Sequence, residues 1–308
     1  MAFEPPRRLV RALGEAHGEA VAGDWLARLP ELAREAVAAR KAEVERVVAP
    51  GGRSGLVLLV RLPDGTPATL KVAPPFAAPG RERAALAHWN GWGAVRVLGA
   101  PGDGPDTGDG PGLLLERLSP DVTLRSLPEA KALLEAAGTV RRLWVEPPAG
   151  HGFESVADRT ARQAAVMRDR AAPEPPGVVA LVTAALEARE ALVADAPECL
   201  LLHGCFRQGK VLSAGRAPWL AVGPDPLVGE RAYDLARLAR DRVEDLVAAS
   251  SGSAAARRRV GRLADSLEVD RERLRGWTLF RAVESGTRAL AAGRRQDGEV
   301  LLEFAAWL

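Results

Sequence analysis

Lysines are rare in this sequence, and their chemistry makes them the first residues to consider. Of the 42 basic residues, the lysines are only Lys41, Lys71, Lys131 and Lys210. In a chain that uses arginine at nearly every basic position, a lysine is more informative than usual. Lys71 ends a short apolar run, and its ammonium is a compact point cation. Lys210 lies beyond His203 and Cys205, in a polar stretch between two apolar runs. Taken alone, each is equally compatible with a solvated surface residue.

The first third of the chain predicts the elements that would position Lys71. Residues 3–48 have apolar side chains at helical spacing and predict helix. Residues 56–73 read as strand, turn and strand around Pro63-Asp64-Gly65. The remaining elements of this part are a helix at 81–89, strands at 95–98 and 113–116, and a mobile loop at 101–110, which lacks apolar groups.

After residue 118 the pattern becomes mostly helical. Long helices are predicted at 127–145, 153–172 and 176–194, and again from about 230 to the end. A small β element interrupts them, with short strands at 200–203, 211–212 and 219–222. We therefore predict an α+β chain with a β-rich lobe at 1–117 and a mostly helical lobe at 118–308.

Composition narrows the class of protein. The 308 residues are 47% hydrophobic and carry a net charge of only +2, so we expect neither a nucleic-acid partner nor a membrane partner. The two cysteines, Cys199 and Cys205, are badly placed to bridge, which is typical of a reducing compartment. No signal peptide is recognisable at the first residues, so we expect a cytoplasmic protein. The abundance of arginine and alanine suggests a bacterial genome rich in G and C.

Several short motifs occur together and in order. They are Gly51-Gly52-Arg53-Ser54-Gly55, Asp64-Gly65-Thr66, Leu70-Lys71-Val72, residues 92–98, residues 113–118, residues 218–222 and 224–230, Tyr233-Asp234-Leu235 and Gly276-Trp277-Thr278-Leu279. In this arrangement the chain resembles the aminoglycoside phosphotransferases of the streptomycin 6-phosphotransferase and hydroxyurea-kinase branch. The resemblance spans roughly residues 20–300 and implies a protein-kinase-like fold with two lobes.

The resemblance implies a nucleotide site in the first lobe. Lys71 would contact the α- and β-phosphates, and Glu82 would orient Lys71. Ser54 and Gly55 would form the loop over the phosphates, and the backbone around Glu116 would be the hinge that holds adenine. The implied cofactor is ATP or another nucleotide.

The catalytic motifs depart from the family pattern. His203 matches the family's loop histidine, a structural anchor. Cys205 stands where the family has the catalytic aspartate, Lys210 where it has a metal-binding asparagine, and Gly223 where it has the main metal-binding aspartate. Because Mg²⁺ requires hard oxygen ligands, the sequence predicts no intact catalytic residue and no intact metal site.

Three compensations are open at the sequence level. Lys210 could bind the phosphates itself and allow a nucleotide to bind without Mg²⁺. Asp225 could replace the missing metal ligand, although between two prolines it also suits a turn. Cys205 could act as a nucleophile or as a base, but a buried, inert thiol is the simpler interpretation.

The late helical stretch at 280–293 holds one acidic residue, Glu284, with Arg288 nearby. Aminoglycosides are polycations, so a neutral or anionic ligand, or none, fits this stretch better. The main hypothesis is a catalytically impaired pseudokinase that binds a nucleotide, a small molecule or a protein partner. One alternative is an active ATP-dependent phosphotransferase, a small-molecule or antibiotic kinase with a non-standard site. The other is an interaction protein without nucleotide binding.

Overall fold

The computed structural model describes residues 3–99 and 112–308 and divides into two compact units. The first unit comprises Met1–Thr123 and Val211–Gly223, and the second comprises Leu124–Lys210 and Pro224–Leu308. The predicted lobes, 1–117 and 118–308, differ from these units chiefly by the returning segment at 211–223. The predicted loop at 101–110 lies outside the described residues.

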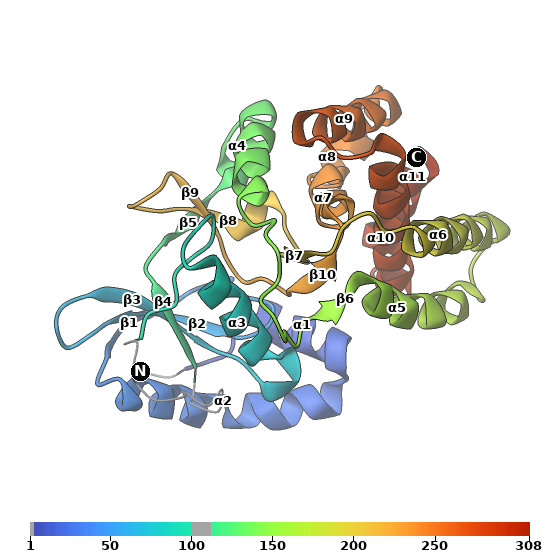
Figure 1. The fold of residues 1–308 in the computed structure, drawn as a ribbon. Coiled ribbons are helices and arrows are strands. Elements are labelled where there is room, and N and C mark those ends of the chain that lie inside the picture. The colour runs from blue at the N-terminus through green and yellow to red at the C-terminus, as the bar shows by residue number, and fades with distance from the viewer. Residues whose placement is uncertain (1–2, 100–111) are drawn as a thin grey trace. The chain divides into compact units, whose positions relative to one another are not determined.

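The first unit is built on an antiparallel sheet in the order β1-β2-β3-β4, with strands β1 (Glu43–Val47), β2 (Leu56–Arg61), β3 (Pro67–Val72) and β4 (Leu113–Glu116). Helices α1 (Arg7–His17) and α2 (Glu19–Ala39) pack their apolar residues onto this sheet (Figure 1). Alternate residues of β2, such as Leu56 and Leu58, are buried there beside Leu70 of β3. The short helices η1 (Pro75–Ala77) and α3 (Pro79–Trp89) follow β3.

A second, smaller sheet completes the first unit. It has the order β5-β8-β9, with strands β5 (Ser119–Thr123), β8 (Val211–Ser213) and β9 (Trp219–Ala221). Ala94 forms a parallel bridge with Ala221, and the Ala221 N–H donates to the Gly93 carbonyl at 2.9 Å. Segments far apart in the sequence thereby meet, and the end of β9 leads directly to Gly223.

The second unit is mostly helical. Its elements are η2 (Leu124–Ser126), α4 (Glu129–Arg141), α5 (Val156–Ala171), α6 (Pro176–Ala194), η3 (Gln208–Lys210), α7 (Arg231–Ala239), α8 (Val243–Ala248), α9 (Gly252–Leu267), α10 (Arg271–Ala291) and α11 (Arg295–Ala306). A small sheet of order β6-β10-β7 joins Glu154–Ser155, Leu227–Gly229 and Leu200–Leu202. Helix α10 packs against α5, α6, α7, α9 and α11 (Figure 1). Gly276 allows α10 to lie close to α6, because a Cβ there would lie 2.9 Å from Leu192 of α6.

The order of strands and helices confirms the predicted α+β class, and several local predictions were wrong. The helix predicted at 3–48 ends at Ala39, and Glu43–Val47 forms the edge strand β1. The strand predicted at 95–98 makes only an isolated bridge, between Val97 and Leu115. The helical run from 230 is divided after Ala239, and the strands β5, β6 and β10 were missed. These strands are short, and long-range pairing rather than local pattern stabilises them. Within the described residues, no helix is long and apolar enough to cross a membrane.

Glu230, immediately before α7, joins that helix to α10. Its buried carboxylate accepts hydrogen bonds from Trp277 Nε1 at 2.6 Å and from Arg273 Nε and Nη2 at 2.6 and 2.7 Å. Removal of the carboxylate leaves the buried Trp277 indole N–H without its acceptor and Arg273 without its ion-pair partner, although Arg273 Nη2 still donates to the Leu192 carbonyl. Glu230→Ala should therefore lower the free energy of unfolding by about 3 kcal/mol. Glu272→Ala, at an exposed ion pair with Arg275, should change it by less than about 0.5 kcal/mol. Urea unfolding measures both, and equal effects would contradict this account.

Candidate nucleotide and catalytic-loop site

Lys71 and Glu82 form a buried ion pair in the first unit. Lys71 lies in the central strand β3, paired with Val57 of β2 and Leu113 of β4, so its position is fixed from both sides. Glu82 lies in the first turn of α3, and its Oε2 is 2.5 Å from Lys71 Nζ. The two side chains are only 8% and 6% exposed, and Glu82 Oε1 has no hydrogen-bond partner within residues 3–99 and 112–308. A buried pair with an unsatisfied oxygen contributes little stability, which favours a binding role.

The glycine-rich turn between β1 and β2 lies against the end of β3. A Cβ on Gly55 would lie 2.6 Å from the carbonyl oxygen of Val72, the residue after Lys71. Only glycine permits this approach without displacing the strand. The predicted phosphate loop, with Ser54 and Gly55, is therefore placed beside the strand end that carries Lys71. A role for Ser54 on phosphate stays a prediction.

Glu116, at the end of β4, is engaged by protein groups. Its carboxylate accepts from Arg216 Nε and Nη2 at 2.7–3.1 Å and from the Arg96 N–H at 2.7 Å. The side chain therefore fastens β4 to neighbouring loops of the first unit. The predicted hinge role concerns its backbone and stays a prediction.

Asp234 holds the predicted catalytic loop (residues 202–212) where it runs through the second unit. This aspartate lies in the first turn of α7, and its buried carboxylate accepts from the N–H groups of His203 and Gly204 at 2.9 and 2.8 Å. Burial raises the pKa of Asp234, against the opposing charges of His203 and Arg281. Gly204 has a φ of 75°, and a Cβ there would lie 1.8 Å from the Asp225 carbonyl oxygen. The motif Tyr233-Asp234-Leu235 does not by itself reveal this role, because the contacts of Asp234 are to residues about 30 positions earlier in the chain.

Cys205 and Lys210, two of the departures from the family pattern, meet in the loop. Lys210 Nζ lies 2.7 Å from Cys205 Sγ, and His203 Nδ1 lies 3.7 Å from the same sulfur. The Gln208 N–H donates to Asp241 at 2.6 Å and fixes η3, the turn that carries Lys210. An ammonium therefore occupies the part of the loop where a metal ligand was expected. Gly223, in the first unit, offers no side chain and has a φ of 60°.

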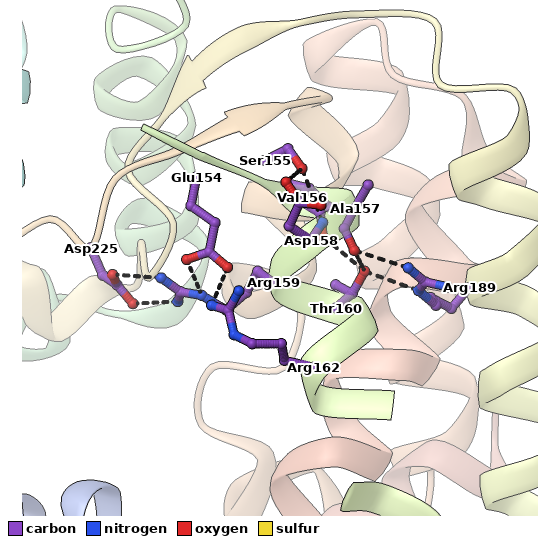
Figure 2. Close-up of polar contacts among 10 residues, drawn as sticks. All are labelled: Glu154, Ser155, Val156, Ala157, Asp158, Arg159, Thr160, Arg162, Arg189 and Asp225. Carbon is purple, nitrogen blue, oxygen red and sulfur yellow. Dashed lines mark hydrogen bonds and ion pairs between the residues drawn. The ribbon is translucent and has the colours of Figure 1, made fainter. Parts of the chain in front are cut away.

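Asp225 is held by an arginine (Figure 2). Its oxygens accept from Arg159 Nη1 and Nη2 at 2.8 and 3.1 Å, while Arg159 Nε donates to Glu154 at 3.0 Å. Arg162, from the next turn of α5, also bonds Glu154. Burial would raise the pKa of Asp225, but the hydrogen bonds and charge of Arg159 outweigh it and lower the pKa, helped by Lys210 and Arg281. Asp225 is thus a charged partner of Arg159.

Known proteins are similar to this chain in sequence over most of its length. The sequence pattern of the family "aminoglycoside/hydroxyurea antibiotic resistance kinase" matches residues 40–293. A streptomycin 6-kinase of Streptomyces glaucescens is 33% identical over 305 residues, covering 98% of this chain and 94% of that protein. A hydroxyurea phosphotransferase of Kitasatospora aureofaciens is 34% identical over 264 residues, covering 83% and 71%.

The chain belongs to the aminoglycoside/hydroxyurea antibiotic resistance kinase family.

Solved structures support the family's kinase-like fold. The crystal structure of aminoglycoside phosphotransferase APH(4)-Ia aligns with a TM-score of 0.60 at 17% identity, covering 89% of this chain and 96% of that one. That of APH(3'')-Id from Streptomyces rimosus, in complex with ADP and streptomycin, aligns with a TM-score of 0.54 at 17% identity, covering 83% and 98%. The predicted family and the predicted kinase-like fold are both confirmed.

The residues present do not fit the Mg²⁺ of a kinase reaction. Cys205, Lys210 and Gly223 offer none of the hard oxygen ligands that Mg²⁺ prefers. Lys210 brings a positive charge to the loop, and both oxygens of Asp225 already accept from Arg159. The nucleotide half does fit its ligand, because Lys71 retains an oriented ammonium. The weak metal role predicted for Asp225 stays a prediction.

The Asp225–Arg159 pair should make stability depend on pH at the acid end. A carboxylate with a lowered pKa stabilises the fold above its ordinary value, about 3.9, and loses this contribution as pH falls through the lowered value. Asp225→Asn should therefore lower the melting temperature at pH 7, and the difference from wild type should shrink below about pH 3. Thermal melts across pH 2.5–7 test this. Asp158→Asn, on the same helix as Arg159, is the control; a difference for Asp225→Asn that is independent of pH would contradict the assignment.

Proposed function

We propose that this protein binds a nucleoside triphosphate and transfers a phosphoryl group to a small molecule, using a catalytic loop of non-standard composition. The observation that carries the proposal is the buried Lys71–Glu82 pair, in which Lys71 Nζ lies 2.5 Å from Glu82 Oε2. Lys71 is also one of the few lysines in the chain. The names of the relatives, streptomycin 6-kinase and hydroxyurea phosphotransferase, also support transfer. They favour this alternative over the pseudokinase, the main hypothesis from the sequence.

Phosphoryl transfer is chemically compatible with the residues in the loop. The reaction depends mostly on position and on stabilisation of charge, and less on proton removal, because its transition state is loose. A bound nucleoside triphosphate would supply the phosphoryl group. Lys71 would orient the α- and β-phosphates, and Lys210 would place positive charge at the catalytic loop. The sulfur of Cys205, 2.7 Å from Lys210 Nζ, would hold that ammonium in position.

A second candidate function is nucleotide binding without transfer. It is favoured by the three positions that lack oxygen ligands, namely Cys205, Lys210 and Gly223. In that case the protein would act through a nucleotide-bound conformation that a protein partner or a small molecule recognises.

Acceptor-dependent ADP release from ATP separates the two candidates. Purified protein would be assayed with streptomycin, with hydroxyurea and with small hydroxyl-bearing carboxylates and phosphate esters, each with Mg²⁺ and with EDTA. Transfer predicts release that depends on one acceptor and falls by about 10²-fold in Lys71→Ala, since an oriented phosphate-binding donor is lost. Lys131→Ala, an exposed lysine of α4, is the matched control and should keep full activity.

Other outcomes point elsewhere. Calorimetric binding of ATP without ADP release supports the second candidate, above all if Cys205→Asp, Lys210→Asn and Gly223→Asp together create activity. Failure of ATP to bind under any condition overturns both candidates and leaves the interaction protein.

A further inference from the structure

Arginines gather around the catalytic loop in the second unit. The arginine cluster consists of Arg207 from the loop, Arg237 from α7, Arg240 from the residue that follows α7, and Arg281 and Arg288 from α10. The Arg207 guanidinium lies close to the loop backbone, because a Cβ on Gly209 would lie 2.8 Å from Arg207 Nη1. The guanidinium of Arg207 therefore folds over the loop instead of extending away from it.

Arg281 connects α10 to both the loop and α7. Its Nη1 donates to the Tyr233 carbonyl and its Nη2 to the Gly204 carbonyl, each at 2.9 Å. Its guanidinium carbon lies 4.2 Å from the centre of the Tyr233 ring. Arg237 follows Tyr233 by one helical turn on α7 and so lies on the same side of that helix. The charges of Arg281 and Arg237 are thereby brought together beside the catalytic loop.

Two of these arginines, Arg237 and Arg240, have no ion pair with a carboxylate of the described residues. Arg237 Nε is buried and has no hydrogen-bond partner among the described residues. Burial, together with the positive charges of Arg281 and Arg207, lowers the pKa of Arg237 to about 10. Arg240, also buried, donates to the neutral Ser285 Oγ at 2.9 Å. Such charges are costly to bury unless an anion compensates them.

The neighbouring carboxylates already have partners. Asp234 accepts from the His203 and Gly204 N–H groups, and Asp241 accepts from the Gln208 N–H. Glu284 is shared by Arg170 and Arg288, at 3.7 and 3.4 Å, and by Ser285. These three carboxylates are fewer than the five arginines of the cluster, so positive groups outnumber negative groups here.

We propose that the arginine cluster is a binding site for a phosphate or carboxylate group, with Arg237 as the principal donor. Charge-assisted hydrogen bonds from guanidinium groups suit such anions. If the protein is a phosphotransferase, the acceptor is then an anionic small molecule rather than a polycation. The acceptor assignment rests on the proposed function, whereas the anion site itself does not.

Calorimetry with inorganic phosphate on the full chain, in EDTA and without nucleotide, tests the site. Wild type should bind phosphate, and Arg237→Gln should weaken binding at least about tenfold, since a charge-assisted bond is lost. Arg168→Gln, an exposed arginine on α5, is the matched control and should bind as wild type does. Lys71→Ala should keep phosphate binding even where it loses ATP, which separates failure of this site from failure of the proposed function.

Thermal melts give a second readout that a fold defect would not produce. Without phosphate, Arg237→Gln should melt about 2–4 °C above wild type, because a poorly compensated buried charge is removed. Phosphate should raise the melting temperature of wild type but not of the variant. Absence of phosphate binding by wild type, or equal binding by wild type and Arg237→Gln, would overturn the site. If phosphate stays bound at saturating ATP, the result supports the acceptor assignment. If ATP displaces phosphate, the cluster binds the phosphates of the nucleotide and the acceptor assignment is overturned.

Discussion

The carboxylate of Asp234 accepts two backbone hydrogen bonds from the catalytic loop, and the form of the loop depends on them. With His203 and Gly204 held in this way, the Asp225 N–H reaches the His203 carbonyl at 3.0 Å, and the chain passes Gly204 too closely for any side chain. These contacts involve backbone groups. The loop can therefore keep a kinase-like course while the side chains at 205 and 210 change. Retention of the fold consequently says nothing about retention of the family's catalytic chemistry.

What has changed is the sign of the charge around that backbone. A kinase loop that uses Mg²⁺ presents carboxylate and amide oxygens to the ion. Here Lys210 contacts Cys205, and arginines are paired with or lie near the remaining acids. In the first unit, by contrast, Lys71 and Glu82 form the pair expected of a nucleotide site. The two observations are consistent if phosphates are bound by protein cations, so that the role of the metal passes to side chains.

The sequence predicted the parts of the site that depend on local order. Lys71 at the end of an apolar run and Glu82 at the start of a helix were placed correctly, and α6 has the predicted bounds of 176–194. It did not predict contacts between residues distant in the chain, such as Arg159 with Asp225. It also missed β1, because Glu43–Val47 is an exposed edge strand whose partner supplies its stability. The incomplete pairing of Arg237 likewise depends on tertiary packing and leaves no mark in sequence spacing.

We propose that side-chain cations take the place of the metal, and calorimetry of ATP binding with Mg²⁺ and with EDTA measures this. The two dissociation constants should lie within about threefold of each other, a difference below about 1 kcal/mol. Binding in EDTA should also weaken when Lys210 is replaced by Asn. ATP binding that requires Mg²⁺, and that is indifferent to Lys210→Asn, would contradict the proposal.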